Sequence, residues 1–226
     1  MTTRLLAIET AGDLCSVALA VDTEITAAEA AGPRMHARSL LPLIDGLLRA
    51  GGVRLAEIDA IAFGRGPGSF TGVRLAAAVA QGLALGAQLP VIPVSTLAAL
   101  AQAVHCPRVA VAVDARMDQV YWGVFAQDTG DVVPLADECV IDPAVAVLPA
   151  GQWCGVGSGF ARYWEHFPEA LQARVRLDPA VSAAHARHIL SLAQILFRAG
   201  TILSPAAALP VYLRDNVAKK SVISER

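Results

Sequence analysis

Acidic residues end two separate apolar runs, in the pattern of strands that finish at a binding edge. Glu9 and Thr10 end one such run, and Asp114 and Arg116 end another. In a phosphotransferase, carboxylates at strand ends hold a metal ion or orient a water molecule. We therefore predict that these four residues face one ligand cleft.

A glycine-rich run from Phe63 to Arg74 reads FGRGPGSFTGVR. Its glycines permit positive φ angles and close approach of other groups, and Ser69 and Thr71 are both suited to cap the helix that follows. Amide groups at a helix start favour an anion such as a phosphate, and the two arginines of the run add positive charge. The run does not match GxxxxGK[ST], so it is not a P-loop. Gly66, Gly68, Ser69 and Thr71 are thus candidates for anion binding, and the alternative is a tight turn that only docks a helix on a sheet.

The segment from Leu75 to Leu89 contains no charged residue. Such a helix is buried on more than one side: one side can cover a sheet, and the other needs a partner helix from this chain or another. A second predicted helix, His36 to Leu48, has a wide apolar face. We predict that both helices contact a partner protein. The residues predicted for this contact are His36, Leu40, Ile44, Leu47, Val73, Ala76, Ala77, Ala80, Leu83 and Ala84.

Composition limits the class of protein. The chain has 226 residues, 55% hydrophobic and 17% charged, which is enough for one domain or two small ones. Its net charge of -2 does not indicate a nucleic-acid binder. Glu9 interrupts the first apolar run, and glycines and prolines interrupt 75–104, so neither a signal peptide nor a membrane span is expected. The four cysteines lack CxxC spacing, so we expect reduced thiols in a cytoplasmic protein.

The predicted elements follow the order β-β-β-α-β-α-β and then begin again. Strands are expected at 5–10, 16–21, 24–30, 58–63 and 91–94, and helices at 36–48, 72–87 and 96–104. A second set of strands at 109–114, 120–125 and 138–141 indicates an internal duplication, and further helices are expected at 160–167 and 183–198. The prediction is an α/β fold of two β-β-β-α-β-α subdomains, 1–106 and 107–226, with the ligand cleft between them. Which half the last helix packs on stays open.

Two smaller patterns have alternative interpretations. His185 and His188 are spaced to touch one metal ion, but no acid or thiol is close in sequence, so a capping or solvated pair is favoured. No metal site and no cofactor are predicted. Lys219 and Lys220 belong to a polar tail, for which a loose end is favoured over contact with RNA.

Several runs together resemble one known family. They are GRGPGSFTGVR at 64–74, QGLA at 81–84, VSTL at 94–97, VDAR at 113–116 and PVYLR at 210–214. The duplicated halves resemble the ASKHA fold of actin, heat-shock chaperones and sugar kinases. The runs are similar to the TsaB family, formerly called YeaZ, and the resemblance covers residues 5–216.

The resemblance implies a non-catalytic paralogue of TsaD. Such a protein pairs with TsaD and, with the ATPase TsaE, supports threonylcarbamoyl transfer to the adenosine beside the anticodon of ANN-reading tRNAs. Helices 36–48 and 72–87 would contact the same helices of TsaD, or those of a second copy as a homodimer. Contact with tRNA would be indirect, and no membrane would be involved.

The resemblance also implies that catalytic ligands are missing. Two metal-binding histidines of TsaD relatives fall on Thr96 and Leu100 here, and neither is a suitable ligand. The 155–159 run is shorter than the nucleotide-binding element expected in the active paralogue, and Glu9 occupies a position where many TsaB relatives carry Asp. These departures favour a partner protein over an enzyme. The alternative is an independent ATPase or kinase that uses Glu9, Asp114 and the glycine turns; a metallopeptidase is disfavoured by the missing ligands.

Overall fold

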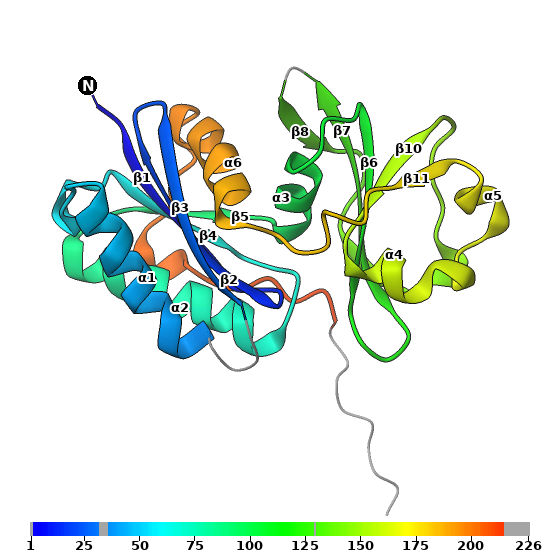
Figure 1. The fold of residues 1–226 in the computed structure, drawn as a ribbon, viewed down its shortest axis with the longest axis horizontal. Helices are drawn as coiled ribbons and strands as arrows, with labels where there is room; N and C mark the ends of the chain where they lie inside the picture. Colours follow the sequence, from blue (N-terminus) through cyan, green and yellow to red (C-terminus); the bar gives the residue numbers. More distant parts are fainter. Residues whose placement is uncertain (1, 32–35, 129, 215–226) are drawn as a thin grey trace, which may run out of the picture.

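The computed structural model describes residues 2–31, 36–128 and 130–214, which form two sheets with helices around and between them (Figure 1). The strand order is β3-β2-β1-β4-β5 in the first sheet and β11-β10-β6-β7-β8 in the second, where β9 also pairs with β7. Both sheets begin with an antiparallel hairpin and continue with parallel strands. The predicted α/β class is confirmed.

The first sheet brings three parallel strand ends to one edge. Its strands are β1 (Arg4–Glu9), β2 (Leu14–Val21), β3 (Glu24–Ala31), β4 (Ala60–Gly64) and β5 (Val91–Val94). Strand β4 pairs in parallel with both β1 and β5. Glu9, Gly64 and Val94 are consequently neighbours at the carboxyl edge, where the alternation of apolar residues gives way to turns.

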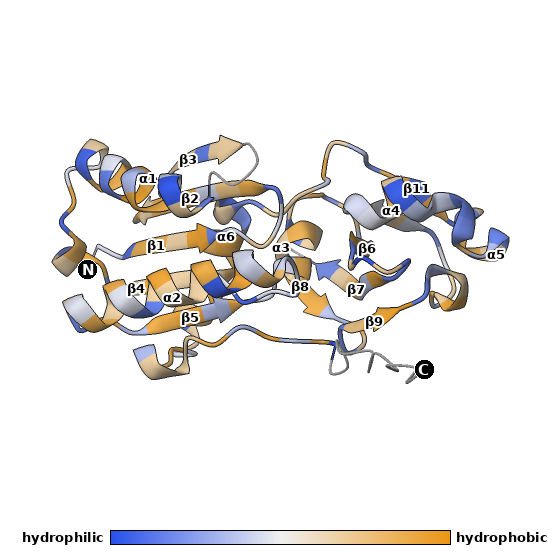
Figure 2. Cartoon of the chain, turned by 90° about the horizontal axis from the view of Figure 1, so that it is seen from below, coloured by the Kyte–Doolittle hydropathy of each residue, from blue (hydrophilic) through white to orange (hydrophobic). Residues whose placement is uncertain are grey.

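Helices cover both faces of the first sheet. Helix α1 (His36–Ala50) packs on β2 and β3, and α2 (Phe70–Ala87) packs on β4 and β1. The two lie across the same face, as Figure 2 shows from below. Helix α6 (Ala186–Arg198) covers the opposite face, where it contacts β1, β2, β4 and β5. The last helix thus packs on the first sheet, although it follows the second sheet in sequence.

The second half is built around an aromatic core. Its strands are β6 (Arg108–Asp114), β7 (Val120–Asp128), β8 (Asp131–Pro134), β9 (Cys139–Ile141), β10 (Trp153–Val156) and β11 (Val175–Leu177), and its short helices are α4 (Ser158–Tyr163) and α5 (Glu169–Gln172). Phe160 packs against Trp122, with ring centroids 6.0 Å apart, and against Phe167 at 4.9 Å. These rings fill the space between the sheet and α4.

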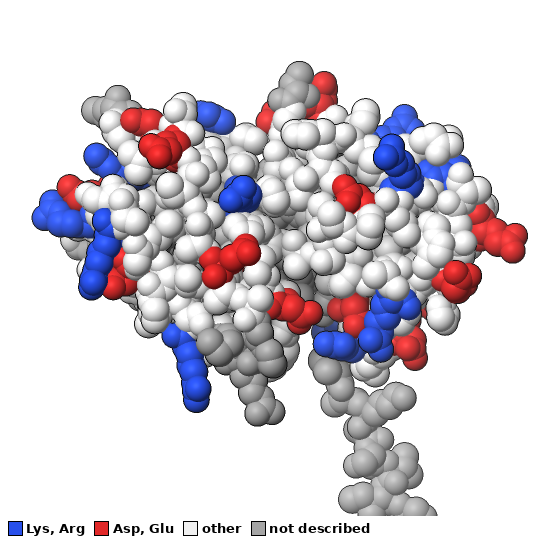
Figure 3. All heavy atoms as spheres, in the orientation of Figure 1, with Lys and Arg blue, Asp and Glu red and all other residues white. Residues whose placement is uncertain are grey.

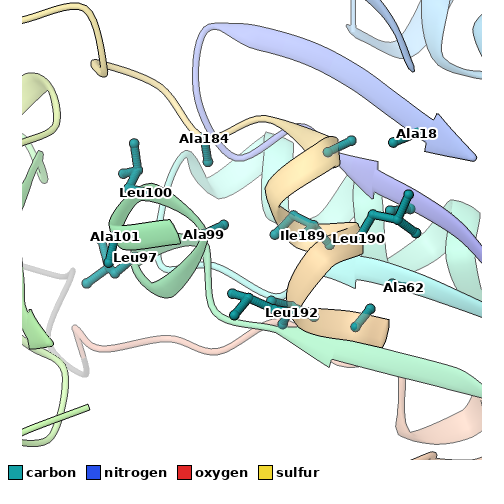
Figure 4. Close-up of a cluster of buried hydrophobic side chains, with 14 of the residues drawn as sticks. Ala18, Ala62, Leu97, Ala99, Leu100, Ala101, Ala184, Ile189, Leu190 and Leu192 are labelled. Atoms are coloured by element: carbon teal, nitrogen blue, oxygen red, sulfur yellow. The ribbon is translucent and has the colours of Figure 1, made fainter. Parts of the chain in front are cut away.

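A continuous apolar layer joins the halves. Helix α3 (Thr96–Gln102) contacts α6 of the first half and β6, β7 and β8 of the second. Figure 4 shows Leu97 and Leu100 of α3 in the same cluster as Ile189 and Leu190 of α6, which lie against the first sheet. The layer shares side chains from both halves, so the division into subdomains at residue 106 stays a prediction.

Most expected elements occur within about two residues of their expected bounds. Two expectations were incomplete. The second sheet contains β8, β10 and β11, for which no residues were predicted, in addition to β9. The last helix begins at Ala186 rather than Ala183, because His185 caps it: its Nδ1 accepts the Arg187 amide at 3.0 Å. The tail containing Lys219 and Lys220 lies outside the described residues.

The expectation of four reduced thiols is wrong in this structure. Cys106 and Cys154 are joined in a disulfide, with Cα atoms 6.3 Å apart, and Cys15 and Cys139 are free. The pairing follows from sheet register, because β10 lies beside β6 and Cys154 is opposite Val109. The two cysteines are separated by 48 residues, so no local spacing indicates the bond.

Most residues of the predicted partner surface are buried inside this chain, so that part of the prediction is wrong. Val73, Ala76, Ala77, Ala80 and Ala84 are all buried. In α1, Leu40, Ile44 and Leu47 are buried in the same way. All of these side chains except Val73 belong to the core between the helices and the first sheet. All eight are buried, so they are not available to another protein in this conformation. His36 and Leu83 are partly exposed.

We predict that Ala80→Arg unfolds or strongly destabilises the protein, whereas Ala78→Arg does not. Ala80 has no exposed surface, and a longer charged side chain there would be both overpacked and desolvated, at a cost of about 3 kcal/mol. Ala78 is exposed on the same helix, so its substitution should change stability by about 0.5 kcal/mol or less. Urea denaturation of both variants measures the difference. Equal midpoints for the two would contradict the packing of α2.

Candidate functional site

A cleft of about 1100 Å³ lies between the two halves. The first half contributes Gly68, Ser69, Phe70 and Arg74, the second contributes residues 113–117, Ser158 and Arg162, and the segment 211–214 closes one side. Of the predicted cleft residues, Gly68, Ser69, Asp114 and Arg116 line it. Glu9, Thr10, Gly66 and Thr71 do not.

The glycine-rich turn positions α2 very close to the end of β1. Gly72 lies against the Thr10 carbonyl, and a Cβ there would overlap it; a Cβ at Gly68 would collide with Ala11. Hydrogen bonds fix the contact: Thr10 Oγ1 donates to the Gly72 carbonyl at 2.7 Å, and the Ser69 amide donates to the Ala11 carbonyl at 2.7 Å. Gly68 and Gly72 are therefore required for α2 to dock on the sheet. This agrees with the interpretation of the run as a tight turn that docks a helix.

Ser69 caps α2, as its position in the sequence predicted. Its Oγ accepts the Gly72 amide at 3.4 Å. Thr71 is exposed in the first turn of the helix and makes no cap. Gly66 is buried beneath the turn with a φ of +92°, a conformation that favours glycine.

Glu9 is enclosed in the protein instead of facing the cleft. It has no exposed surface, accepts the Ala11 amide, and accepts the Thr96 hydroxyl at 3.0 Å. A Cβ at Gly64 would overlap its carboxylate. Burial raises the pKa of Glu9 to about 7, against the opposing effect of its hydrogen bonds. Glu9 thus ties the ends of β1 and β4 to the start of α3, and the prediction that it and Thr10 face a ligand is wrong.

Asp114 occupies the corresponding position of the second half and does line the cleft. Its carboxylate accepts the Arg116 amide at 2.8 Å and the Tyr163 hydroxyl at 3.0 Å. It also lies 3.2 Å from the Arg116 guanidinium and 3.6 Å from that of Arg162. Asp114 is therefore surrounded by donors and is not free to act as a base.

The two positions implied as metal ligands in TsaD relatives are found beside the cleft. Thr96 and Leu100 both line it, and the Thr96 hydroxyl is committed to Glu9. Within residues 2–31, 36–128 and 130–214, no group of three or more His, Cys, Asp and Glu side chains is placed to hold a metal ion.

An acidic residue that is far away in the sequence lies beside His185 in the fold. Glu29 of β3 lies 3.0 Å from His185 Nε2, while Nδ1 of the same ring caps α6. Burial lowers the pKa of His188 to about 4, so this ring is neutral near pH 7. The capping interpretation of His185 is confirmed.

A second candidate surface is the outer side of α2. Its exposed positions include Ala78, Gly82 and Leu85, and Leu85 is 59% exposed. A Cβ at Gly82 or at Gly86 would meet nothing within 4 Å. The partner residues predicted on α2 lie mostly on its buried stripe, and the exposed stripe of the same helix was not predicted as a surface. The outer stripe carries no charge because the whole segment 75–89 has none.

Helix α2 is also long and apolar enough to cross a membrane by length and composition. Its buried residues nevertheless pack on β4 and β1 of the first sheet. That packing is typical of a core helix, and the absence of a membrane partner stays a prediction.

Comparison with known proteins assigns the family. Residues 29–222 match the family model described as "TsaD: tRNA N6-adenosine threonylcarbamoyltransferase". The chain is 40% identical to the tRNA threonylcarbamoyladenosine biosynthesis protein TsaB of Escherichia coli K12, over 97% of this chain and 98% of that protein. It is 38% identical to the TsaB protein of Haemophilus influenzae, over 96% of each. The chain belongs to the TsaB family.

Solved structures of the family have the same fold. The structure described as YeaZ from Pseudomonas aeruginosa matches with a TM-score of 0.88 and 43% identity, covering 93% of this chain and 100% of that one. A second Pseudomonas aeruginosa structure, described as similar to peptidase YEAZ, matches with the same score and identity. The TsaB resemblance and the duplicated ASKHA-type fold are therefore confirmed, and the protein takes part in threonylcarbamoyladenosine biosynthesis on tRNA.

We predict that Glu9 makes stability fall between about pH 4.5 and 7. The folded protein holds this proton more tightly than the unfolded chain, in which the pKa is about 4.5. The stabilising contribution is therefore complete below pH 4.5 and is lost as the pH rises through about 7, by about 3 kcal/mol in total. Glu9→Gln keeps an acceptor for the Ala11 amide but cannot ionise.

Urea denaturation of both proteins at pH 5 and pH 8 measures this effect. The change in unfolding free energy from pH 5 to pH 8 should be less negative for Glu9→Gln than for the unchanged protein. Parallel pH profiles would contradict a buried, proton-binding Glu9.

Proposed function

We propose that this protein is a non-catalytic scaffold and activator of TsaD, in the cytoplasm, in the transfer of threonylcarbamoyl to the adenosine beside the anticodon of ANN-reading tRNAs. The outer face of α2 is the observation that carries the proposal. It presents an uncharged stripe on a helix whose other side is already covered by the first sheet. A stripe of this kind is suited to contact a second protein.

The size of the side chains on this stripe indicates the kind of contact. Ala78, Gly82 and Gly86 allow another helix to approach closely, and Leu85 supplies exposed apolar area. Helix α1 has its buried side on the same sheet, so its outer side, which includes Leu41 at 53% exposure, faces the same way. Two helices of a TsaD protein, or of a second copy of this chain, would complete a four-helix contact.

The placement of the two predicted carboxylates supports a non-catalytic role. Glu9 is enclosed beneath the turn, and Asp114 is paired with arginines. The alternative of an independent ATPase or kinase needs both carboxylates in the cleft. Catalysis would therefore reside in TsaD, with TsaE as the ATPase that completes the assembly.

We predict that Gly82→Arg or Ala78→Arg abolishes co-purification with TsaD and leaves the chain folded. Either change places a charge in an apolar contact that would otherwise be desolvated, and both positions are exposed in the free chain. The matched control is Ala170→Arg, on an exposed helical alanine of the second half. Size-exclusion chromatography with light scattering should show the same loss for the homodimer. Normal TsaD binding by both α2 variants would exclude this surface.

The activity itself is tested by reconstitution. Threonylcarbamoyl transfer and ATP hydrolysis are measured with this protein alone, with TsaD, and with TsaD and TsaE together. Transfer only in the complete mixture is expected. Transfer or steady ATP turnover by this chain alone, abolished by Asp114→Ala, would establish the enzyme alternative instead.

A further inference from the structure

The cleft between the halves is lined by four arginines. They are Arg74 from α2, Arg116 from the β6–β7 turn, Arg162 from α4 and Arg214 from the segment that crosses between the halves. Asp13 and Asp114 are the two acidic residues that line it among the described residues. The protein as a whole has a net charge of -2. The lining of the cleft has the opposite sign, because its arginines outnumber its acidic residues.

Three of these arginines are held in place. Arg116 and Arg162 both lie beside the Asp114 carboxylate, at 3.2 and 3.6 Å. Arg214 donates to Gln119 Oε1 at 2.6 Å and lies 3.4 Å from the Arg116 carbonyl. Asp118 lies close enough to Arg162 to add a second negative charge. With Arg214 included, three arginines face these two acids, so this wall keeps a net positive charge.

The turn that carries Arg116 has an uncommon backbone. Arg116, Met117 and Asp118 have φ angles of 62°, 55° and 55°, and none of them is glycine. Consecutive non-glycine residues in the left-handed region are strained and cluster at functional sites. The turn is maintained by the Ala115 amide, which donates to the Gln119 carbonyl at 2.9 Å. Its effect is to hold Arg116 and Met117 at the cleft.

The first turn of α2 and the segment 211–214 contribute aromatic rings to the same cleft. The Arg74 guanidinium carbon lies 3.1 Å from the centre of the Phe70 ring and 4.7 Å from that of Tyr212. Phe70 is 66% exposed and Tyr212 48%. Exposed rings beside arginines are the features on which nucleic-acid bases stack while guanidinium groups contact phosphates.

We propose that this cleft binds RNA directly, with Arg116, Arg162 and Arg214 on the phosphate backbone and the Phe70–Tyr212 rim against bases. A polymer fits better than a small phosphate compound, because the charged groups lie at an open rim instead of in an enclosed pocket: the side chains of Arg116 and Arg162 are 76% and 56% exposed. Figure 3 shows charged side chains gathered along the lower edge of the second half, beside the junction with the first. This proposal goes beyond the scaffold role and replaces the expectation that tRNA contact is indirect.

Fluorescence anisotropy of a labelled, unmodified tRNA transcript, titrated with the full chain at several salt concentrations, tests the proposal. Removing two phosphate contacts with Arg116→Ala/Arg162→Ala should weaken binding at least about 10-fold and reduce the slope of log K against log salt by about 2. Arg116→Lys/Arg162→Lys keeps the charges and should retain most of that slope. Arg214→Ala, which breaks no ion pair among the described residues, should reduce it by about 1.

The matched control is Arg49→Ala/Arg54→Ala, which removes two exposed, ion-paired arginines of the first half and should leave binding unchanged. Failure of the unchanged protein to bind RNA, or equal binding by the alanine variants, the Arg214 variant and the control, would overturn the proposal. Submillimolar, stoichiometric binding of ATP or inorganic triphosphate that the alanine variants abolish would assign the cleft to a small polyphosphate instead. None of the cleft variants lies on the outer stripe of α2, so all should still co-purify with TsaD, and the two proposals fail separately.

Discussion

The structure depends on the close approach of α2 to the end of β1. Gly72 touches the Thr10 carbonyl and Gly68 touches Ala11, with no room for a Cβ at either position. This contact fixes α2 on the sheet with its small residues inward, which leaves an uncharged stripe outward. It also brings the first turn of α2, with Phe70 and Arg74, to the rim of the cleft. One backbone contact thus sets both candidate surfaces.

The acidic residues at equivalent strand ends of the two halves have different environments, one buried and one at the cleft. Glu9 ends β1 and is sealed beneath the turn, where it joins β1, β4 and α3, and its raised pKa reflects that burial. Asp114 ends β6 and lies at the cleft, where arginines and Tyr163 surround it. The same position in the topology therefore supplies a structural tie in one half and an anchor for positive charge in the other.

Local patterns in the sequence predicted most elements of the first half, whereas strands β8, β10 and β11 of the second half and the contacts between distant residues were missed. Strand and helix positions follow from apolar periodicity, and the cap at Ser69 follows from residue type. The placement of α6 on the first sheet, the Cys106–Cys154 bond and the approach of Glu29 to His185 all join residues far apart in the chain. No local spacing encodes such contacts, because sheet order and register create them.

Sequence alone is enough to predict that residues 75–89 form a helix without charged residues, that a glycine-rich turn precedes this helix, and that the chain resembles the TsaB family. Only the tertiary structure decided which stripe of α2 is exposed, because the alanines at positions 76, 80 and 84 and the residues at 78, 82 and 85 are similarly uncharged, and only contact with the sheet distinguishes them. The meeting of Arg74, Arg116, Arg162 and Arg214 was likewise a tertiary result. Each arginine belongs to a different element, and the cleft exists only when both halves are folded and joined.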